Sequence, residues 1–159
     1  MQAQESPRDE SPLLSICDAD GEYCDELLAS GACMLVSAYD PGKLSVESIS
    51  KITTFRDSLL SGGLVRPYVL AAGEFPGLDS AYGADRRKLM TLNRSNGGAT
   101  LVRDGVIIAK WPLRSLPDSA DIQELMDVDA PTAVEKENTP RRLKLQGFLL
   151  YVFAVLLLL

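Results

Sequence analysis

The side chains best suited to nucleophilic or redox chemistry in this 159-residue chain are three cysteines, Cys17, Cys24 and Cys33. Their spacing contains no C-x-x-C pair, so it indicates neither a dithiol redox motif nor a zinc ribbon. The chain has no histidine, which excludes Ser-His-Asp and Cys-His nucleophiles and His-ligated metals. We therefore expect no cofactor, no metal and no catalytic residue of these classes, and we favour a binding role over an enzymatic one.

Each cysteine has a structural and a chemical interpretation. Cys33 lies in an apolar run and is most simply a small buried hydrophobic side chain. Cys17 and Cys24 flank an Asp-Gly turn, and a reversible disulfide between them would make the chain a thiol-disulfide oxidoreductase. We keep that activity as the alternative function, because spacing alone does not fix the geometry that a disulfide needs.

Charged residues form two local groups. Five carboxylates crowd the turn near the N-terminus, where a cation-binding loop and a solvated turn are the alternatives. The register of an EF-hand is missing there, which favours the solvated turn. These carboxylates are Asp18, Asp20, Glu22, Asp25 and Glu26.

The second group is basic and contains Arg86, Arg87, Lys88 and Arg94. It is either a solvated helix face with ion pairs to Asp79 and Asp85, or a contact surface for anionic lipid or an acidic partner. The whole chain has a net charge of −6, which disfavours binding to nucleic acid, so we expect no such partner.

These residues must be positioned by alternating strands and helices. After a strand over 13–17, one helical turn over 24–30 should stop at Gly31. Ser45 is the expected N-cap of the following long helix, and Gly62 its C-cap. Asp104-Gly105 predicts a hairpin turn, and Trp111 should lie at the edge of the core. The remaining expected elements are strands over 32–39 and 65–73, helices over 45–63 and 78–96, a hairpin over 98–111 and a helix over 119–128.

Alternation of strands and helices indicates an α/β fold with a parallel core, to which the terminal hairpin adds antiparallel strands. An unrelated α+β sandwich is the alternative. The element order resembles the thioredoxin fold, with the best residue match over SNGGATLVRDGVIIAKW at 95–111. More specifically, LLSICDADGEYCDELL, MLVSAYD and LMTLNRSNGGATLVRDGVIIAKWPLRSLP resemble the thioredoxin-like region attached to bacterial DoxX-family membrane proteins.

This resemblance implies a three-layer thioredoxin-like domain over 13–127, with a mixed central sheet and a terminal β-hairpin. It also implies an integral membrane partner, the four-helix DoxX bundle, which these 159 residues do not contain. Two positions depart from the redox-active pattern. The redox-motif position holds Asp40-Pro41-Gly42-Lys43, and the position of the cis-proline holds Gly97. The resemblance therefore implies a degenerate, redox-inactive copy.

The two ends differ in composition. Residues 1–12 are polar and indicate a disordered leader or linker, and residues 128–142 a polar linker. The uncharged run 147–159 is too short to span a bilayer, but 143–159 reaches the lower limit for a transmembrane helix. We predict a membrane segment over 143–159, complete or continuing beyond Leu159. A buried core helix and a helix that docks into a partner's groove are the alternatives.

Basic residues lie on the N-terminal side of the uncharged run 147–159, namely Arg141, Arg142 and Lys144. The positive-inside rule then places the folded domain on the cytoplasmic side of the cell membrane, as a single-pass protein in contact with lipid. The resulting hypothesis is a membrane-tethered, redox-inactive thioredoxin-like accessory or binding module of a DoxX-type membrane protein.

Overall fold

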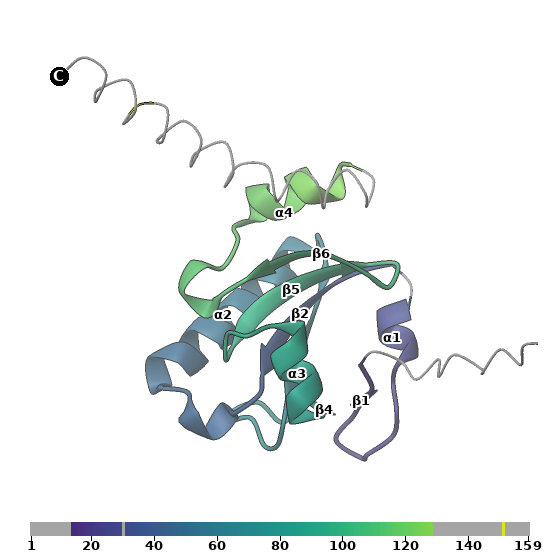
Figure 1. Cartoon of the computed structure of the whole chain (residues 1–159), viewed down its shortest axis with the longest axis vertical. Coiled ribbons are helices and arrows are strands. Elements are labelled where there is room, and N and C mark those ends of the chain that lie inside the picture. The colour runs from purple at the N-terminus through teal and green to yellow at the C-terminus, as the bar shows by residue number, and fades with distance from the viewer. Residues whose placement is uncertain (1–13, 30, 129–150, 152–159) are drawn as a thin grey trace, which may run out of the picture.

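A six-stranded mixed sheet organises the chain in the computed structural model, which describes residues 14–29, 31–128 and 151 (Figure 1). The strand order is β1-β4-β3-β2-β5-β6. The strands are β1 (Ile16–Cys17), β2 (Ala32–Ala38), β3 (Arg66–Ala71), β4 (Tyr82–Ala84), β5 (Gly98–Arg103) and β6 (Val106–Trp111). The helices are α1 (Glu26–Ala29), α2 (Val46–Gly62), α3 (Arg86–Leu92) and α4 (Ser119–Met126), with short 3-10 turns η1 (Pro41–Lys43) and η2 (Leu113–Ser115).

Four strands carry the thioredoxin fold. β2 runs parallel to β3 and is joined to it through α2, as the right-handed crossover of a parallel pair requires. On its other side β2 pairs antiparallel with β5, and β5 pairs antiparallel with β6. The order β3-β2-β5-β6, with a helix before β3, another before β5 and a third after β6, is that of thioredoxin. The predicted α/β fold with a mixed sheet and a terminal hairpin is therefore confirmed, and β4 and β1 extend the sheet beyond β3.

Helices cover both faces of the sheet, which gives three layers (Figure 1). On one face, Met34, Val36 and Leu101 pack with Ile52 of α2 and Ile122 of α4. On the other face, residues of β2 and β5 pack with α3, β1 and α1. This second cluster contains Ile16, Cys33, Leu35, Leu70, Leu89, Leu92 and Val102. Because β2 is buried on both faces, it reads in the sequence as a continuous apolar run.

The long helix α2 forms where its caps and periodicity predict. Ser45 is the N-cap, and its hydroxyl oxygen accepts a hydrogen bond from the Ser48 N–H at 3.1 Å. The predicted C-cap at Gly62 is wrong by one residue. Gly62 is the last helical residue, and Gly63 takes the left-handed conformation with φ of +65°.

The helix expected over 78–96 is much shorter in the structure, because its first half contributes a strand. Tyr82–Ala84 forms β4, which lies between β3 and β1. Gly83 permits this pairing, because a Cβ there would come within 2.9 Å of the Cys17 sulfur. Helix α3 begins only after Asp85, whose carboxylate accepts a hydrogen bond from the Lys88 N–H at 3.1 Å. Leu78 and Tyr82, which the range 78–96 would place in the helix, therefore lie outside it.

The remaining short elements follow their local signals. Asp104 and Gly105 both have positive φ, +51° and +77°, which suits a two-residue hairpin turn. Gly31, with φ of +73°, follows the single turn of α1. Asp118 and Asp121 form a reciprocal capping box at the start of α4.

The predicted membrane segment 143–159 and the linker 128–142 lie outside the described residues, except for Val128 and Tyr151. The leader 1–12 also lies outside them. Within the described part of the chain, no helix is both long and apolar enough to cross a bilayer.

Candidate functional site

The segment at the redox-motif position is a closed turn at the end of β2. Lys43 N–H donates to the Asp40 carbonyl at 3.1 Å, which shapes the 3-10 turn η1. The Asp40 carboxylate forms ion pairs with the Lys43 ammonium at 3.1 Å and the Arg86 guanidinium at 3.3 Å. Only 21% of the Asp40 side chain is exposed. A paired, largely buried carboxylate therefore lies in the turn that follows β2.

Asn96 joins this turn to the segment before β5. Its side-chain amide donates to the Asp40 carbonyl at 2.7 Å, and its side-chain oxygen accepts the Asp40 N–H at 3.1 Å. The next residue, Gly97, donates its N–H to the Ser37 carbonyl at 2.8 Å. The structure thus brings the two positions singled out in the sequence, Asp40 to Lys43 and Gly97, together at the carboxyl end of β2.

Gly97 has a backbone conformation that favours glycine. Its φ is +95°, which proline cannot adopt because its ring fixes φ near −65°. The described residues contain no cis peptide bond. A Cβ on Gly97 would lie 2.8 Å from Cδ1 of Ile52 and 3.2 Å from Cδ2 of Leu113. The loop is therefore packed for glycine at this position.

No cysteine is part of this turn. Cys33 lies near the start of β2 and precedes Asp40 by seven residues, which corresponds to about 23 Å of extended chain. The Cys17 thiol approaches the Gly83 carbonyl at 3.5 Å. The Cys24 thiol lies 3.9 Å from the Asp18 carboxylate. All three cysteines are free.

The surroundings of Cys24 and Cys33 oppose thiolate formation. Burial raises the pKa of the Cys33 thiol to about 11. The pKa of Cys24 is raised by desolvation and by the negative charges of Asp18 and Glu26. Since the thiolate is the nucleophile, these surroundings lower the reactive fraction of both thiols.

The acidic turn between the first two cysteines is held by its own hydrogen bonds. One Asp18 carboxylate oxygen accepts the N–H groups of Asp20 and Glu22, each at 3.0 Å. Asp25 accepts the Ile16 N–H at 2.8 Å. These bonds account for the clustering of carboxylates by local turn chemistry. Across the described ranges, no group of three or more His, Cys, Asp or Glu side chains could hold a metal ion.

The predicted basic group is divided in the structure. Arg86 points to Asp40, whereas Arg87 and Lys88 line a cavity on the other side of α3. Arg94 lies beyond the end of α3 and is exposed. Of the two carboxylates considered as ion-pair partners, Asp79 precedes α3 and Asp85 is its N-cap.

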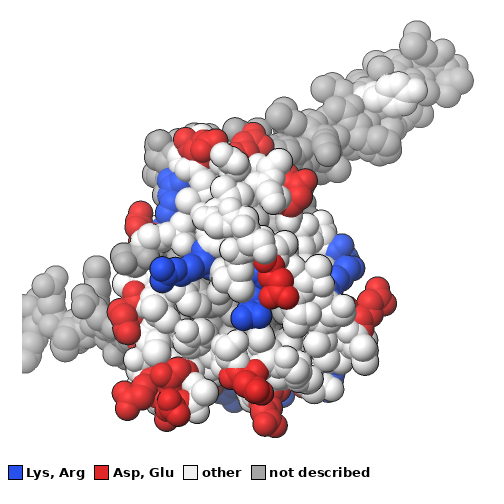
Figure 2. Space-filling model, turned by 180° about the vertical axis from the view of Figure 1, so that it is seen from behind, with Lys and Arg blue, Asp and Glu red and all other residues white. Residues whose placement is uncertain are grey.

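On the side of the molecule seen in Figure 2, described Lys and Arg side chains are scattered among Asp, Glu and uncharged residues. That side therefore offers no continuous basic surface to an anionic membrane. The predicted membrane flank, Arg141, Arg142 and Lys144, lies outside the described residues.

A buried polar cluster beneath the site was not anticipated from the sequence. The Asn93 side chain donates to the carbonyls of Ala99 at 3.0 Å and Trp111 at 3.1 Å. A Cβ on Gly98 would come within 2.6 Å of this amide, so glycine is needed beside it. The Ser37 hydroxyl is fully buried and has no hydrogen-bond partner among the described residues. One sequence signal could have indicated this role. Asn93 directly follows a helical pattern, where an asparagine side chain favours hydrogen bonds to the nearby backbone.

The sequence matches no protein-family model and no curated protein. Among solved structures, the chain is similar to yeast Sco1, with 10% identity, a TM-score of 0.48, and coverage of 72% of this chain and 90% of that one. It is also similar to the exposed lipoprotein thioredoxin Etrx1 of Streptococcus pneumoniae, with 12% identity, a TM-score of 0.47, and coverage of 72% and 98%. ScoI of Bradyrhizobium japonicum with copper bound has 15% identity, a TM-score of 0.41, and coverage of 70% and 96%. Similarity at this level says nothing about activity, and the thioredoxin fold is assigned from the strand order described above.

Proposed function

We propose that this chain is a membrane-tethered accessory or binding module that uses a thioredoxin fold without dithiol chemistry. The observation that carries this proposal is the turn at Asp40 to Lys43. Its carboxylate is neutralised by Lys43 and Arg86, and its backbone is bonded to Asn96. A site for thiol-disulfide exchange needs an accessible thiolate instead.

The tether and the partner are supported by sequence alone. The uncharged run 147–159 follows Arg141, Arg142 and Lys144, which favours insertion with the domain on the cytoplasmic side. The resemblance of LMTLNRSNGGATLVRDGVIIAKWPLRSLP to DoxX-attached domains favours a DoxX-type bundle as partner.

The thiol part of the proposal is tested by disulfide reduction. We expect the wild-type chain to reduce a protein disulfide, with dithiothreitol as electron source, no faster than the uncatalysed reaction. A Cys17→Ser/Cys24→Ser variant is the matched control and should behave identically. A wild-type rate well above background that is lost in this variant would establish the alternative, a thiol-disulfide oxidoreductase.

The tether is tested by membrane fractionation of the full chain. After an alkaline wash the wild type should remain in the membrane pellet. A Val152→Arg/Leu156→Arg variant, which places two charges in the apolar run, should be released. Recovery of the wild type in the soluble fraction would contradict the tether. Cross-linking in membranes that contain a DoxX-type bundle tests the partner, and a lack of cross-links would contradict it.

A further inference from the structure

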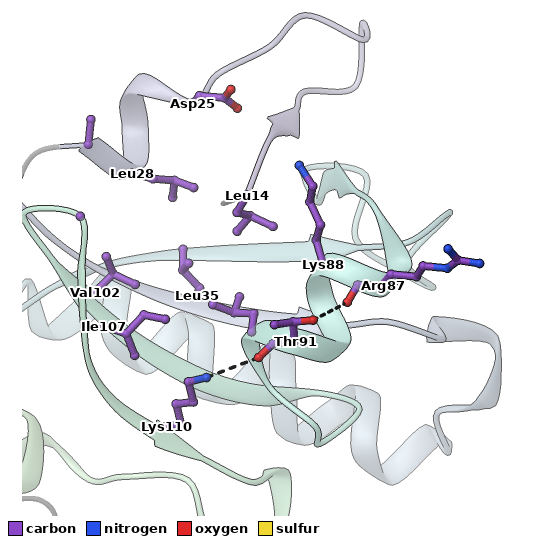
Figure 3. Close-up of a pocket in the computed structure, with 13 residues that line it drawn as sticks. Leu14, Asp25, Leu28, Leu35, Arg87, Lys88, Thr91, Val102, Ile107 and Lys110 are labelled. Carbon is purple, nitrogen blue, oxygen red and sulfur yellow. Dashed lines mark hydrogen bonds between the residues drawn. The ribbon is translucent and has the colours of Figure 1, made fainter. Parts of the chain in front are cut away.

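A cavity of about 480 Å³ lies on the α3 face of the sheet, away from the Asp40 turn. Its walls come from segments far apart in the chain: Leu14 before β1, Leu28 of α1, Thr91 of α3 and Ile107 of β6 (Figure 3). The volume lies within the range of roughly 300–1,000 Å³ that is typical of small-molecule sites.

The floor of the cavity is apolar. Leu35, Leu92 and Val102 belong to the buried core and close it from below. Leu14 and Leu28 are only partly buried, and Ile107 is 39% exposed. Binding of an apolar group in such a concavity is favourable, because it removes apolar surface from water.

The rim of the cavity is basic, in a chain whose net charge is −6. Arg87, Lys88 and Lys110 line it, against a single carboxylate from Asp25. Figure 3 shows Lys88 and Lys110 on opposite sides of the leucine floor, with the guanidinium of Arg87 extending outward. The Lys110 ammonium donates one hydrogen bond, to the Thr91 carbonyl at 3.4 Å, which leaves two of its N–H groups to donate elsewhere.

An apolar floor inside a basic rim matches a ligand with a hydrocarbon body and an anionic head. We propose that this cavity binds a single-chain anionic amphiphile of the fatty-acid class, with its chain on the leucine floor and its carboxylate at the Lys110 ammonium on the rim. A peptide fits the floor less well, because the peptide's backbone N–H and C=O groups would have no partners there. This binding depends neither on the membrane tether nor on the absence of thiol chemistry.

The test is calorimetric titration of the full chain with dodecanoate below its micelle concentration. We expect saturable one-to-one binding that tightens by up to about fourfold per methylene from octanoate to dodecanoate. Dodecanol, which has the same chain and no charge, should bind at least about tenfold more weakly, since a charge-assisted hydrogen bond is lost.

Matched variants locate the site. Lys110→Glu should weaken dodecanoate binding at least about tenfold. Arg114→Glu makes the same charge change at an exposed residue outside the cavity, and it should leave the affinity within about twofold. A spin-labelled fatty acid should broaden the methyl resonances of Leu14, Leu28 and Ile107.

Three results would overturn the proposal. The first is equal binding of dodecanol and dodecanoate, and the second is equal weakening by Lys110→Glu and Arg114→Glu. The third is absence of saturable binding, which would mean that other residues of the chain or a second copy cover the cavity.

Discussion

At the scale of single residues, the buried amide of Asn93 ties the hairpin to the end of α3. Ala99 of β5 and Trp111 of β6 are direct partners in the sheet, and the Asn93 side chain donates to both of their carbonyls. Its own oxygen accepts the Ser95 N–H at 3.0 Å. One side chain thus satisfies three backbone groups in a region that water does not reach freely.

Truncation of this amide should therefore be costly. We expect Asn93→Ala to lower the free energy of unfolding by about 3 kcal/mol, because it leaves buried backbone groups without partners. Urea denaturation followed by circular dichroism measures the loss. Thr91→Ala removes an exposed hydroxyl bonded to the Arg87 carbonyl and should cost less than about 0.5 kcal/mol. Similar losses in the two variants would contradict this role of Asn93.

The buried thiol of Cys33 should make stability depend on pH in the alkaline range. Its pKa in the folded chain is raised to about 11, against an ordinary value of 9.0. The fold therefore favours the neutral thiol, and this contribution is complete below pH 9 and declines as pH rises toward 11. The stability lost in this way should amount to roughly 2 kcal/mol by pH 11.

The measurement compares the wild type with Cys33→Ala, so that titration of the tyrosines cancels. We expect the stability advantage of the wild type to shrink between pH 8.5 and pH 11. A constant difference over that range would show that the thiol ionises as freely in the folded chain as in the unfolded one.

At the scale of elements, the junction between Gly97 and β5 holds the turn after β2 in place. We expect Gly97→Ala to cost about 2 kcal/mol or more, because the residue has φ of +95° and its new Cβ would lie 2.8 Å from Ile52. Thermal unfolding measures this. Gly62→Ala is the matched control. Gly62 is helical, with no atom within 4 Å of its added Cβ, so the change should be neutral or stabilise by up to about 1 kcal/mol. Equal effects of the two substitutions would contradict the packing at Gly97.

Elements were predictable where a local signal determined them. Helix α2, the buried strand β2 and the hairpin turn at Asp104 follow from caps, an apolar run and turn residues. Tyr82–Ala84 was mistaken for helix, because β4 exists only through pairing with β3 and β1, which are distant in sequence. The cavity on the α3 face escaped prediction for the same reason. Leu14, Lys88 and Lys110 come together only when the sheet has formed.

At the scale of the whole molecule, stability should fall from the centre of the sheet to its β1 edge. β2 pairs with β3 on one side and β5 on the other over residues 33–37, whereas β1 has two residues and pairs with β4 alone among the named strands. Elements with few partners open locally at lower free energy than the core.

The native cysteines report this gradient without any substitution. We expect iodoacetamide to modify Cys17 at least about 100-fold faster than Cys33, since Cys33 needs global unfolding to become accessible. Peptide mass spectrometry against time gives the rates. In concentrated guanidinium chloride the thiols should react alike. Equal rates in the folded chain would mean that the sheet opens as one unit.

The position of β2 also determines what the chain exposes while it folds. Cys33 finds its partners Arg66 and Val102 only 33 and 69 residues later, whereas the β5–β6 hairpin closes locally across Asp104-Gly105. Hairpins close within about 1–10 μs, and contacts between distant segments form more slowly. During synthesis, the uncharged apolar run ACMLVSA emerges well before β5 exists to cover it. Such a run is prone to self-association, so we expect the nascent chain to depend on chaperones that shield this strand.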